Sequence, residues 1–246
     1  MADPTGEVIL GLDTSTEHAA ICIVSGDSLL GERWVEPVAG GRPRHGSAML
    51  TELEQLVAVA GGWPQIDLIA VGVGPGSFTG LRIGIATARA LAQSTGIPIA
   101  AVGSLDALAA TIATRPEATE RELAPIIDAR RGEGFFSLWS GGSELLDPVV
   151  AGPEELVAAL AARPSPPLAG GSGALRFQAQ LEAAGIAVLD PGAAEHRPSA
   201  AAICRLGQAR GDGPESIEPI YLRRPDAELW RERDQGRREA RGSSGG

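Results

Sequence analysis

Short apolar runs separated by polar and glycine-rich breaks dominate the first hundred residues. Their β-compatible composition predicts five strands, at residues 7–12, 19–24, 29–35, 68–73 and 97–102. Apolar side chains also recur every three or four positions in residues 45–60 and in residues 79–94, which predicts two helices between these strands. A third helix is predicted from Ser104, with Asp106 in its first turn. The order β-β-β-α-β-α-β predicts a mixed sheet with helices packed on it.

The second half of the chain mixes strands and helices in a similar way. We expect paired strands at 124–128 and 134–139, and short strands at 168–171 and 186–189. Helices are predicted at 154–162, 174–184 and 199–210. This coarse similarity of the halves predicts two related lobes, residues 1–103 and 104–224, with the last helix free to pack back on the first lobe. Residues 225–246 are charged and end in Gly-Ser, which predicts a disordered tail.

Composition limits the classes of function. The net charge of −10 disfavours a protein that binds nucleic acid unaided, because phosphate neutralisation needs a basic face. All 21 basic residues are arginine, so a lysine nucleophile, a Schiff base and a P-loop lysine are excluded. We predict a cytoplasmic protein without membrane contact, since the chain has no signal-like segment and no long apolar run. Cys22 and Cys204 lie in apolar segments and are predicted to be buried free thiols.

The most unusual segment is residues 70–92, where a strand runs into a Gly-Pro turn and then a helix. Gly74, Gly76 and Gly80 indicate backbone freedom or close approach. Ser77 and Thr79 stand where the helix begins, so free backbone N–H groups there could hold an anion. A Walker A loop needs the missing lysine, and a dinucleotide fingerprint needs glycine at Thr79. Two interpretations remain: a nest for an anion or a partner's polar group, and a turn that needs glycine for packing.

The helix after this turn carries two overlapping stripes. Gly80, Gly84 and Ala88 form a smooth groove that would let another helix approach closely. An overlapping apolar stripe is formed by Leu81, Ile85, Ala88 and Ala92. A partner interface and a fully buried internal helix explain this pattern equally well. On the interface interpretation, Gly84→Leu would weaken partner binding and leave the fold intact.

Candidate catalytic chemistry is sparse. Asp13, Thr14 and Ser15 link two predicted strands, and they suit either a nucleotide phosphate with its magnesium ion or a local Asx or Ser/Thr turn. The three histidines are isolated from one another in the sequence, so no metal site is predicted. No Ser/His/Asp or Cys/His spacing occurs, and we predict no catalytic residue.

Four segments together resemble the TsaB (YeaZ) family. They are ILGLDTST at 9–16, GPGSFTGLRIG at 74–84, DARRGE at 128–133 and PIYLR at 219–223, in order along nearly the whole folded chain. The resemblance implies an α/β, actin-like, Hsp70-like and sugar-kinase-like (ASKHA) fold of two lobes. It also implies a role in forming N6-threonylcarbamoyladenosine on tRNAs that read ANN codons, with tRNA contacted mainly through partner proteins.

In this family the protein is not the catalyst. The resemblance implies pairing with the metal-bearing transferase TsaD and with the ATPase TsaE, while TsaC-type enzymes supply threonylcarbamoyl-adenylate. The helices at 45–60 and 79–94 would form a helical bundle with TsaD or with a second copy of the chain. The implied contact residues are His45, Met49, Leu53, Leu56, Gly80, Leu81, Gly84, Ile85 and Ala88.

A local comparison supports a non-catalytic role. The catalytic relative carries V-N-H-L-E-G-H at a helix start, and its two histidines hold the metal. Here Ser104 and Leu108 stand at those positions, so the resemblance implies no metal and no cofactor of the chain's own. ATP, ADP and magnesium are expected only at the level of the complex. The alternatives are a small ASKHA ATPase or kinase that uses Asp13 and the Gly74 loop, and a homodimer with a separate role.

Overall fold

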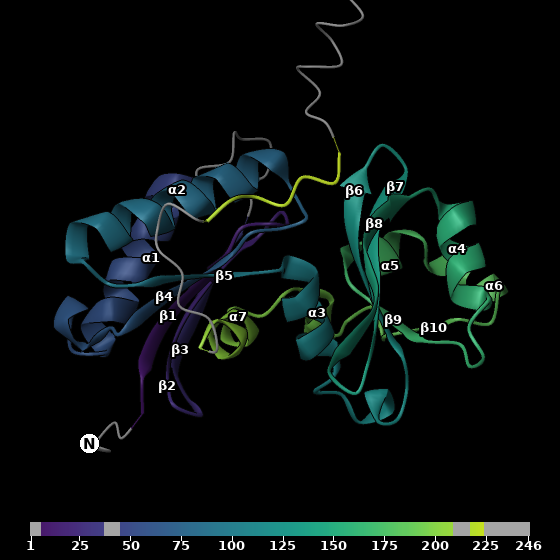
Figure 1. Cartoon of the computed structure of the whole chain (residues 1–246), viewed down its shortest axis with the longest axis horizontal. Coiled ribbons are helices and arrows are strands. Elements are labelled where there is room, and N and C mark those ends of the chain that lie inside the picture. The colour runs from purple at the N-terminus through teal and green to yellow at the C-terminus, as the bar shows by residue number, and fades with distance from the viewer. Residues whose placement is uncertain (1–5, 37–44, 209–216, 224–246) are drawn as a thin grey trace, which may run out of the picture.

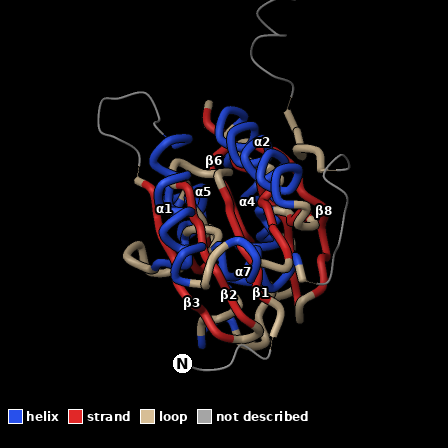
Figure 2. Tube along the Cα trace, turned by 90° about the vertical axis from the view of Figure 1, so that its left-hand side faces the viewer, coloured by secondary structure: helices blue, strands red, loops and turns tan. Residues whose placement is uncertain are grey.

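The first half of the chain folds around a five-stranded sheet (Figure 1). In this computed structural model, which describes residues 6–36, 45–208 and 217–223, the strand order is β3-β2-β1-β4-β5. β1 pairs antiparallel with β2 and parallel with β4, so the sheet is mixed, as predicted. Figure 2 shows β3, β2 and β1 running side by side. The strands are β1 (Val8–Asp13), β2 (Ala19–Ser25), β3 (Ser28–Val35), β4 (Leu68–Gly72) and β5 (Ile99–Val102).

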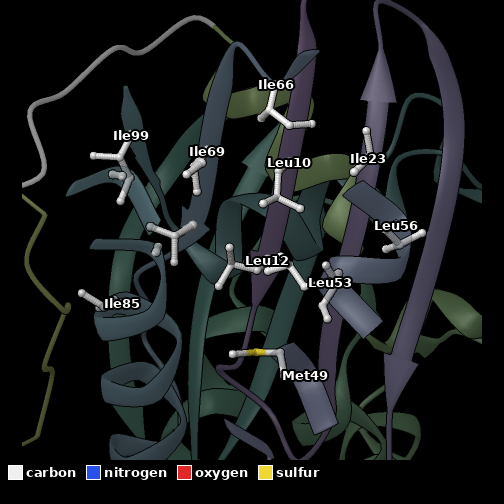
Figure 3. Packing of buried hydrophobic residues seen from close by; sticks show 14 of the residues in the cluster. Leu10, Leu12, Ile23, Met49, Leu53, Leu56, Ile66, Ile69, Ile85 and Ile99 are labelled. Carbon is white, nitrogen blue, oxygen red and sulfur yellow. The ribbon is translucent and has the colours of Figure 1, made fainter. Parts of the chain in front are cut away.

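Helices cover both faces of this sheet because side chains alternate along its strands. Leu10 and Leu12 of β1 face α1 (His45–Val59) and α2 (Phe78–Thr95), where they join the largest apolar cluster (Figure 3). Ile9, on the opposite face, packs with α7 (Ala200–Gly207). Between α1 and β4 the chain makes one 3₁₀ turn, η1 (Trp63–Gln65).

The second half forms another five-stranded sheet, in the order β10-β9-β6-β7-β8. Its strands are β6 (Leu123–Arg130), β7 (Glu133–Ser140), β8 (Ser143–Ala151), β9 (Leu168–Gly170) and β10 (Ala187–Val188). The remaining helices are α3 (Ser104–Ile112), α4 (Pro153–Ala161), α5 (Ser172–Arg176) and α6 (Gln178–Ala183), with 3₁₀ turns η2 (Pro116–Ala118) and η3 (Ala194–His196). α3 packs against β6 and against α7, and so lies between the two sheets (Figure 1).

Two elements of the second half differ from the prediction. β8 was not predicted; it is an edge strand that contains Pro148 and exposed acidic side chains. Proline is tolerated at sheet edges, where its missing N–H faces solvent. The predicted helix at 174–184 is instead two short helices, because the backbone leaves the helical region at Phe177.

The end of the described chain returns to the first sheet. α7 packs on β1, β2 and β4 after the second lobe is complete. Residues 217–223 then run along α2 towards the β6–β7 turn (Figure 1). The predicted tail at 225–246 lies outside the described residues, as do 209–210 of the last predicted helix. Among the helices that the structure describes, none is long and apolar enough to cross a membrane.

Candidate functional site

A cleft of about 980 Å³ lies between the two lobes. The first lobe contributes the β1–β2 turn at 15–18 and the start of α2 at 76–80. The second lobe contributes residues 127–131 and Ser172, and the strap, which we define as residues 217–223, contributes 220–223. The sequence-predicted loops around Asp13 and Gly74 therefore meet at one wall of this cleft.

Asp13 ends β1 directly beneath this wall. Its side chain is buried, and Oδ1 accepts hydrogen bonds from Ser15 N (2.9 Å) and Ser15 Oγ (2.6 Å). Oδ2 accepts a third from Ser104 Oγ (2.7 Å). Burial raises the pKa of the Asp13 carboxyl, and the hydrogen bonds from Ser15 and Ser104 oppose that rise. The bond from Ser15 N to Asp13 Oδ1 is that of a local Asx turn, and the bond from Ser104 engages the other oxygen inside the chain.

Ser104 connects three segments that are distant in sequence. Besides its bond to Asp13, its Oγ accepts a hydrogen bond from Gly74 N (3.2 Å), and its own N–H donates to Gly74 O (2.7 Å). The first residue of α3 thus ties the end of β1 to the Gly74 turn. Ser104 is fully buried, so it is a structural junction and is closed to solvent.

The glycines of the α2 turn accommodate the chain's own β1–β2 turn. A Cβ at Gly80 would overlap the carbonyl oxygen of Thr14, and a Cβ at Gly84 would overlap Thr14 Oγ1. Thr14 Oγ1 donates a hydrogen bond to Gly80 O (2.7 Å), which holds the turn in this groove. Thr14 therefore fills the groove in which the interface interpretation placed a partner helix, which favours the internal-helix interpretation for Gly80 and Gly84. We now expect Gly84→Leu to disturb the fold.

The beginning of α2 is likewise occupied in part by this turn. Ser77 N donates to Ser15 O (2.7 Å), and a Cβ at Gly76 would collide with the backbone of Ser15. Ser77 caps α2 by accepting a hydrogen bond from Gly80 N (3.3 Å). Ser77 and Thr79 remain exposed at the cleft, so only this outer edge of the predicted nest is open.

The predicted partner-contact residues of α1 and α2 lie in the protein's own core. Six of their side chains belong to the main apolar cluster and are at most 4% exposed: Met49, Leu53, Leu56, Leu81, Ile85 and Ala88. They form the helix faces turned towards the sheet, where Figure 3 shows Leu53 and Met49 near Leu12 and Leu56 near Ile23. His45 begins α1, and its side chain lies outside the described part of the chain. A partner on these helices must therefore use other residues.

Charged residues on opposite sides of the cleft contact each other. Arg130, the last residue of β6, forms an ion pair with Glu17 in the β1–β2 turn. Asp128 accepts a hydrogen bond from Arg176 (3.0 Å) and orders the turn through Arg130 N (2.9 Å). Arg130 and Arg131 both have left-handed backbones, with φ of 64° and 55°. The local sequence holds no sign of this ion pair, because Glu17 and Arg130 are 113 positions apart.

The strap fastens the two lobes on one side of the cleft. Ile220 N donates to Val73 O (2.7 Å) in the first lobe. The Tyr221 ring packs 5.1 Å from that of Phe78, whose face is covered by the Arg82 guanidinium. In the second lobe, Arg223 donates to Ala129 O (3.0 Å). The C-terminal motif seen in the sequence is therefore a bridge between lobes.

Within the described part of the chain, no group of three or more His, Cys, Asp or Glu side chains could hold a metal ion. Leu108 is fully buried in apolar surroundings beneath Ser104 on α3. His196 is buried, and its ring nitrogens contact Gly171 and the carbonyl oxygens of Leu189 and Asp190. His18 contacts Glu36 (2.7 Å). Both rings thus have structural partners.

One family model and several known proteins resemble this chain. The model described as TsaD, tRNA N6-adenosine threonylcarbamoyltransferase, matches residues 41–158. The Bacillus subtilis protein named tRNA threonylcarbamoyladenosine biosynthesis protein TsaB is 30% identical over 227 residues, which cover 89% of this chain and 96% of that protein. The Escherichia coli TsaB is 32% identical over 130 residues, which cover 52% of this chain and 53% of that protein.

The similarity extends to three dimensions. The solved structure of YeaZ from Pseudomonas aeruginosa matches with a TM-score of 0.68 and 26% identity, over 88% of this chain and 100% of that chain. A second structure, described as similar to peptidase YeaZ from the same organism, matches with a TM-score of 0.69 and 28% identity. Both matches span the two lobes, and the two mixed sheets with flanking helices confirm the predicted ASKHA-type fold.

Proposed function

Because this chain belongs to the TsaB (YeaZ) family of tRNA threonylcarbamoyladenosine biosynthesis proteins, we propose that it serves this modification as a non-catalytic subunit. In this proposal it binds the transferase TsaD, holds it in an active arrangement and helps to form the surface on which the ATPase TsaE docks. ATP, ADP and magnesium act only in the assembled complex, and tRNA is contacted mainly through the partners.

The state of Asp13 is the observation that carries this proposal. A carboxylate at the end of the first strand could hold a magnesium ion through water, but only with oxygen lone pairs that face the cleft. Here Asp13 is 2% exposed, and both its oxygens accept hydrogen bonds from Ser15 or Ser104. Ser104 stands at the position of a metal-binding histidine in the catalytic relative and is committed to Asp13. These contacts favour a structural use of the residues that would otherwise serve catalysis.

The exposed side of α1 and α2 supports a protein partner. We define the outer face of this helix pair by seven of its exposed residues: Leu50, Glu54, Ala58, Val59, Arg82, Ala86 and Ala90. Leu50 and Val59 are 42% and 67% exposed, and Ala86 and Ala90 stand one turn apart on α2. Small residues at this spacing let a second helix approach closely. The proposed contact with TsaD therefore lies on the outer face, on the same two helices as predicted but through different residues.

An ATPase acting alone is the second candidate, and the volume of the cleft favours it. The space of about 980 Å³ is large enough for a nucleotide, and Ser15, Thr79 and Arg130 line it. The chain has no lysine for the phosphates, and the Asp13 carboxylate is closed off. Magnesium-dependent ATP hydrolysis by the isolated chain, lost in Asp13→Asn, would favour this candidate.

Reconstitution of the tRNA modification tests the proposed function. The adenylate-forming enzyme, TsaD and TsaE from the same organism are combined with tRNA and the small-molecule substrates, with and without this chain. Threonylcarbamoyladenosine is then measured by mass spectrometry of digested tRNA. We expect its formation to depend on this chain, and gel filtration to show a complex with TsaD. Full modification without the chain, or no complex with TsaD when TsaE and nucleotide are present, would contradict the proposal.

A further inference from the structure

The two cysteines of the chain contact each other in the interior of the first lobe. Cys22 lies in the middle of β2, and Cys204 lies on α7, 182 positions later. Their sulfur atoms are 3.3 Å apart, both side chains are fully buried, and both thiols are free. From this geometry we propose that Cys22 and Cys204 are a site of reversible disulfide formation, which fastens the last helix to the first sheet.

The packing around the pair brings the two thiols together. Cys22 is directly opposite Gly11 on β1, and a Cβ at Gly11 would overlap Cys204 Sγ. The absence of a side chain at Gly11 thus lets α7 settle onto the sheet until Cys204 reaches Cys22. Cys204 Sγ also donates weakly to Ile9 O (3.5 Å). A shift of the sulfurs by little more than one ångström would bring them to bonding distance.

The reaction needs an oxidant of the peroxide class and is balanced as follows. One thiol attacks hydrogen peroxide, which gives a sulfenic acid and water. The second thiol then attacks the sulfenic sulfur, forms the S–S bond and releases a second water. The sulfurs together lose two electrons and two protons, and peroxide is reduced to water. A small thiol reverses the step by exchange.

Burial makes this reaction slow in the closed fold. The hydrogen bond with Cys204 and burial raise the pKa of the Cys22 thiol well above its ordinary value, so the reactive thiolate is scarce. Peroxide therefore reaches a thiol only when α7, a helix of eight residues, lifts briefly from the sheet, and the S–S bond forms when the helix packs back. Once formed, the bond would be shielded from reductant by the same packing. It would also hold the point where the chain returns from the second lobe.

The bond would leave the other face of the sheet unchanged. α7 and Cys22 belong to the apolar cluster on one face, whereas α1 and α2 pack on the opposite face (Figure 1). Oxidised protein is thus expected to keep the proposed TsaD contact. The Cys22–Cys204 disulfide and the proposed function are therefore tested separately, because failure of one does not contradict the other.

The test uses the full chain treated with hydrogen peroxide, followed by alkylation in denaturant, which exposes any remaining thiol, and by intact mass measurement. We expect a monomer lighter by two hydrogens, no alkylated cysteine, and one peptide pair that links Cys22 to Cys204. Its melting temperature should rise by about 5–10 °C, because the bond closes a long loop. Reductant should reverse the shift, and Cys22→Ser and Cys204→Ser should each abolish it. The proposal is overturned if the treated protein still has two thiols that alkylate in denaturant, if only intermolecular or sulfinic products form, or if the oxidised monomer loses its circular dichroism.

Discussion

Ser104 donates its hydroxyl to the buried carboxylate of Asp13 over 2.7 Å, and this bond joins residues 91 positions apart. It joins the end of the first strand to the start of the helix that lies between the two sheets. Through Gly74, the same serine also positions the turn that begins α2. One buried hydroxyl thus organises the wall of the cleft on which both candidate phosphate loops stand.

Removal of that hydroxyl should destabilise the fold. Ser104→Ala leaves Asp13 Oδ2 and the Gly74 N–H without this partner in a buried site, which we expect to cost about 1–3 kcal/mol of unfolding free energy. The measurement is urea unfolding at neutral pH. Ser94→Ala is the matched control, because its hydroxyl bonds to Leu91 O at an exposed helix end. The control should lie within about 0.5 kcal/mol of the wild type. Equal stability of the two variants would show that the Ser104 bond is dispensable.

The burial of Asp13 predicts a pH dependence with a definite sign. Since burial raises the pKa of this carboxyl in the folded state, the folded protein holds the proton more tightly than the unfolded chain. The stabilisation of the folded state by protonated Asp13 is fully present below the ordinary pKa of 3.8. It is lost as pH rises through the raised pKa of the folded state. The stability of Asp13→Asn relative to the wild type should therefore increase as pH rises through this window.

Glu122 provides a control of opposite sign. The side-chain hydrogen bonds of Arg163 to Glu122 (2.7 and 2.8 Å) lower the pKa of that carboxyl. The stabilisation of the folded state by ionised Glu122 is fully present above the ordinary pKa of 4.5. It is lost as pH falls through the lowered pKa of the folded state. The stability of Glu122→Gln relative to the wild type should therefore fall as pH rises. Parallel pH curves for the two variants would refute the assignment for Asp13.

Much of the fold could be predicted because local patterns determine it. The strands of the first sheet follow from apolar runs. Each of their predicted ends lies within two residues of the observed one. β8 was missed because Asp147 and Pro148 interrupt its apolar pattern. The adjacent Gly141 and Gly142, both with positive φ, form the two-residue hairpin turn that could have revealed it.

The site was harder to predict because its contacts join distant segments. The glycine spacing on α2 correctly indicates a close approach, yet the same spacing would suit a helix, a phosphate or a loop. Only the structure shows that Thr14 occupies the groove. Similarly, the stripe of Met49 and Leu53 marks one helix face, but periodicity does not say whether that face meets the protein's own sheet or a partner. The Arg130–Glu17 pair has no local signal at all.

The contact between Gly84 and Thr14 predicts that Gly84→Ala lowers stability, which is the opposite of the usual effect of this substitution in a helix. In an ordinary helix interior, Gly→Ala stabilises by about 1 kcal/mol. At Gly84 the added methyl would overlap Thr14 Oγ1, so we expect Gly84→Ala to destabilise by about 1–3 kcal/mol. Thr14→Ala removes the obstructing atom, and the nearest remaining Thr14 atom, its Cβ, is 3.4 Å away.

A double-mutant cycle measures this contact. Gly84→Ala combined with Thr14→Ala should be less destabilised than the sum of the single variants, by about 1 kcal/mol or more. Gly152→Ala is the control, because a Cβ there has open space and the backbone φ is −70°. Additive effects in the cycle would mean that Thr14 does not set the requirement for glycine.

The outer face of α1 and α2 gives the last prediction, which concerns partner binding. Ala86→Arg places a long charged side chain on the exposed side of α2, where the proposed TsaD helix would pack. We expect TsaD affinity to fall at least about tenfold while the melting temperature changes by less than about 2 °C. Ala183→Arg is the matched control, since Ala183 is an exposed helical alanine in the second lobe. Calorimetric titration with TsaD measures both variants. If both bind TsaD like the wild type, the contact lies elsewhere, and if both weaken equally, the loss reflects added charge and not the outer face.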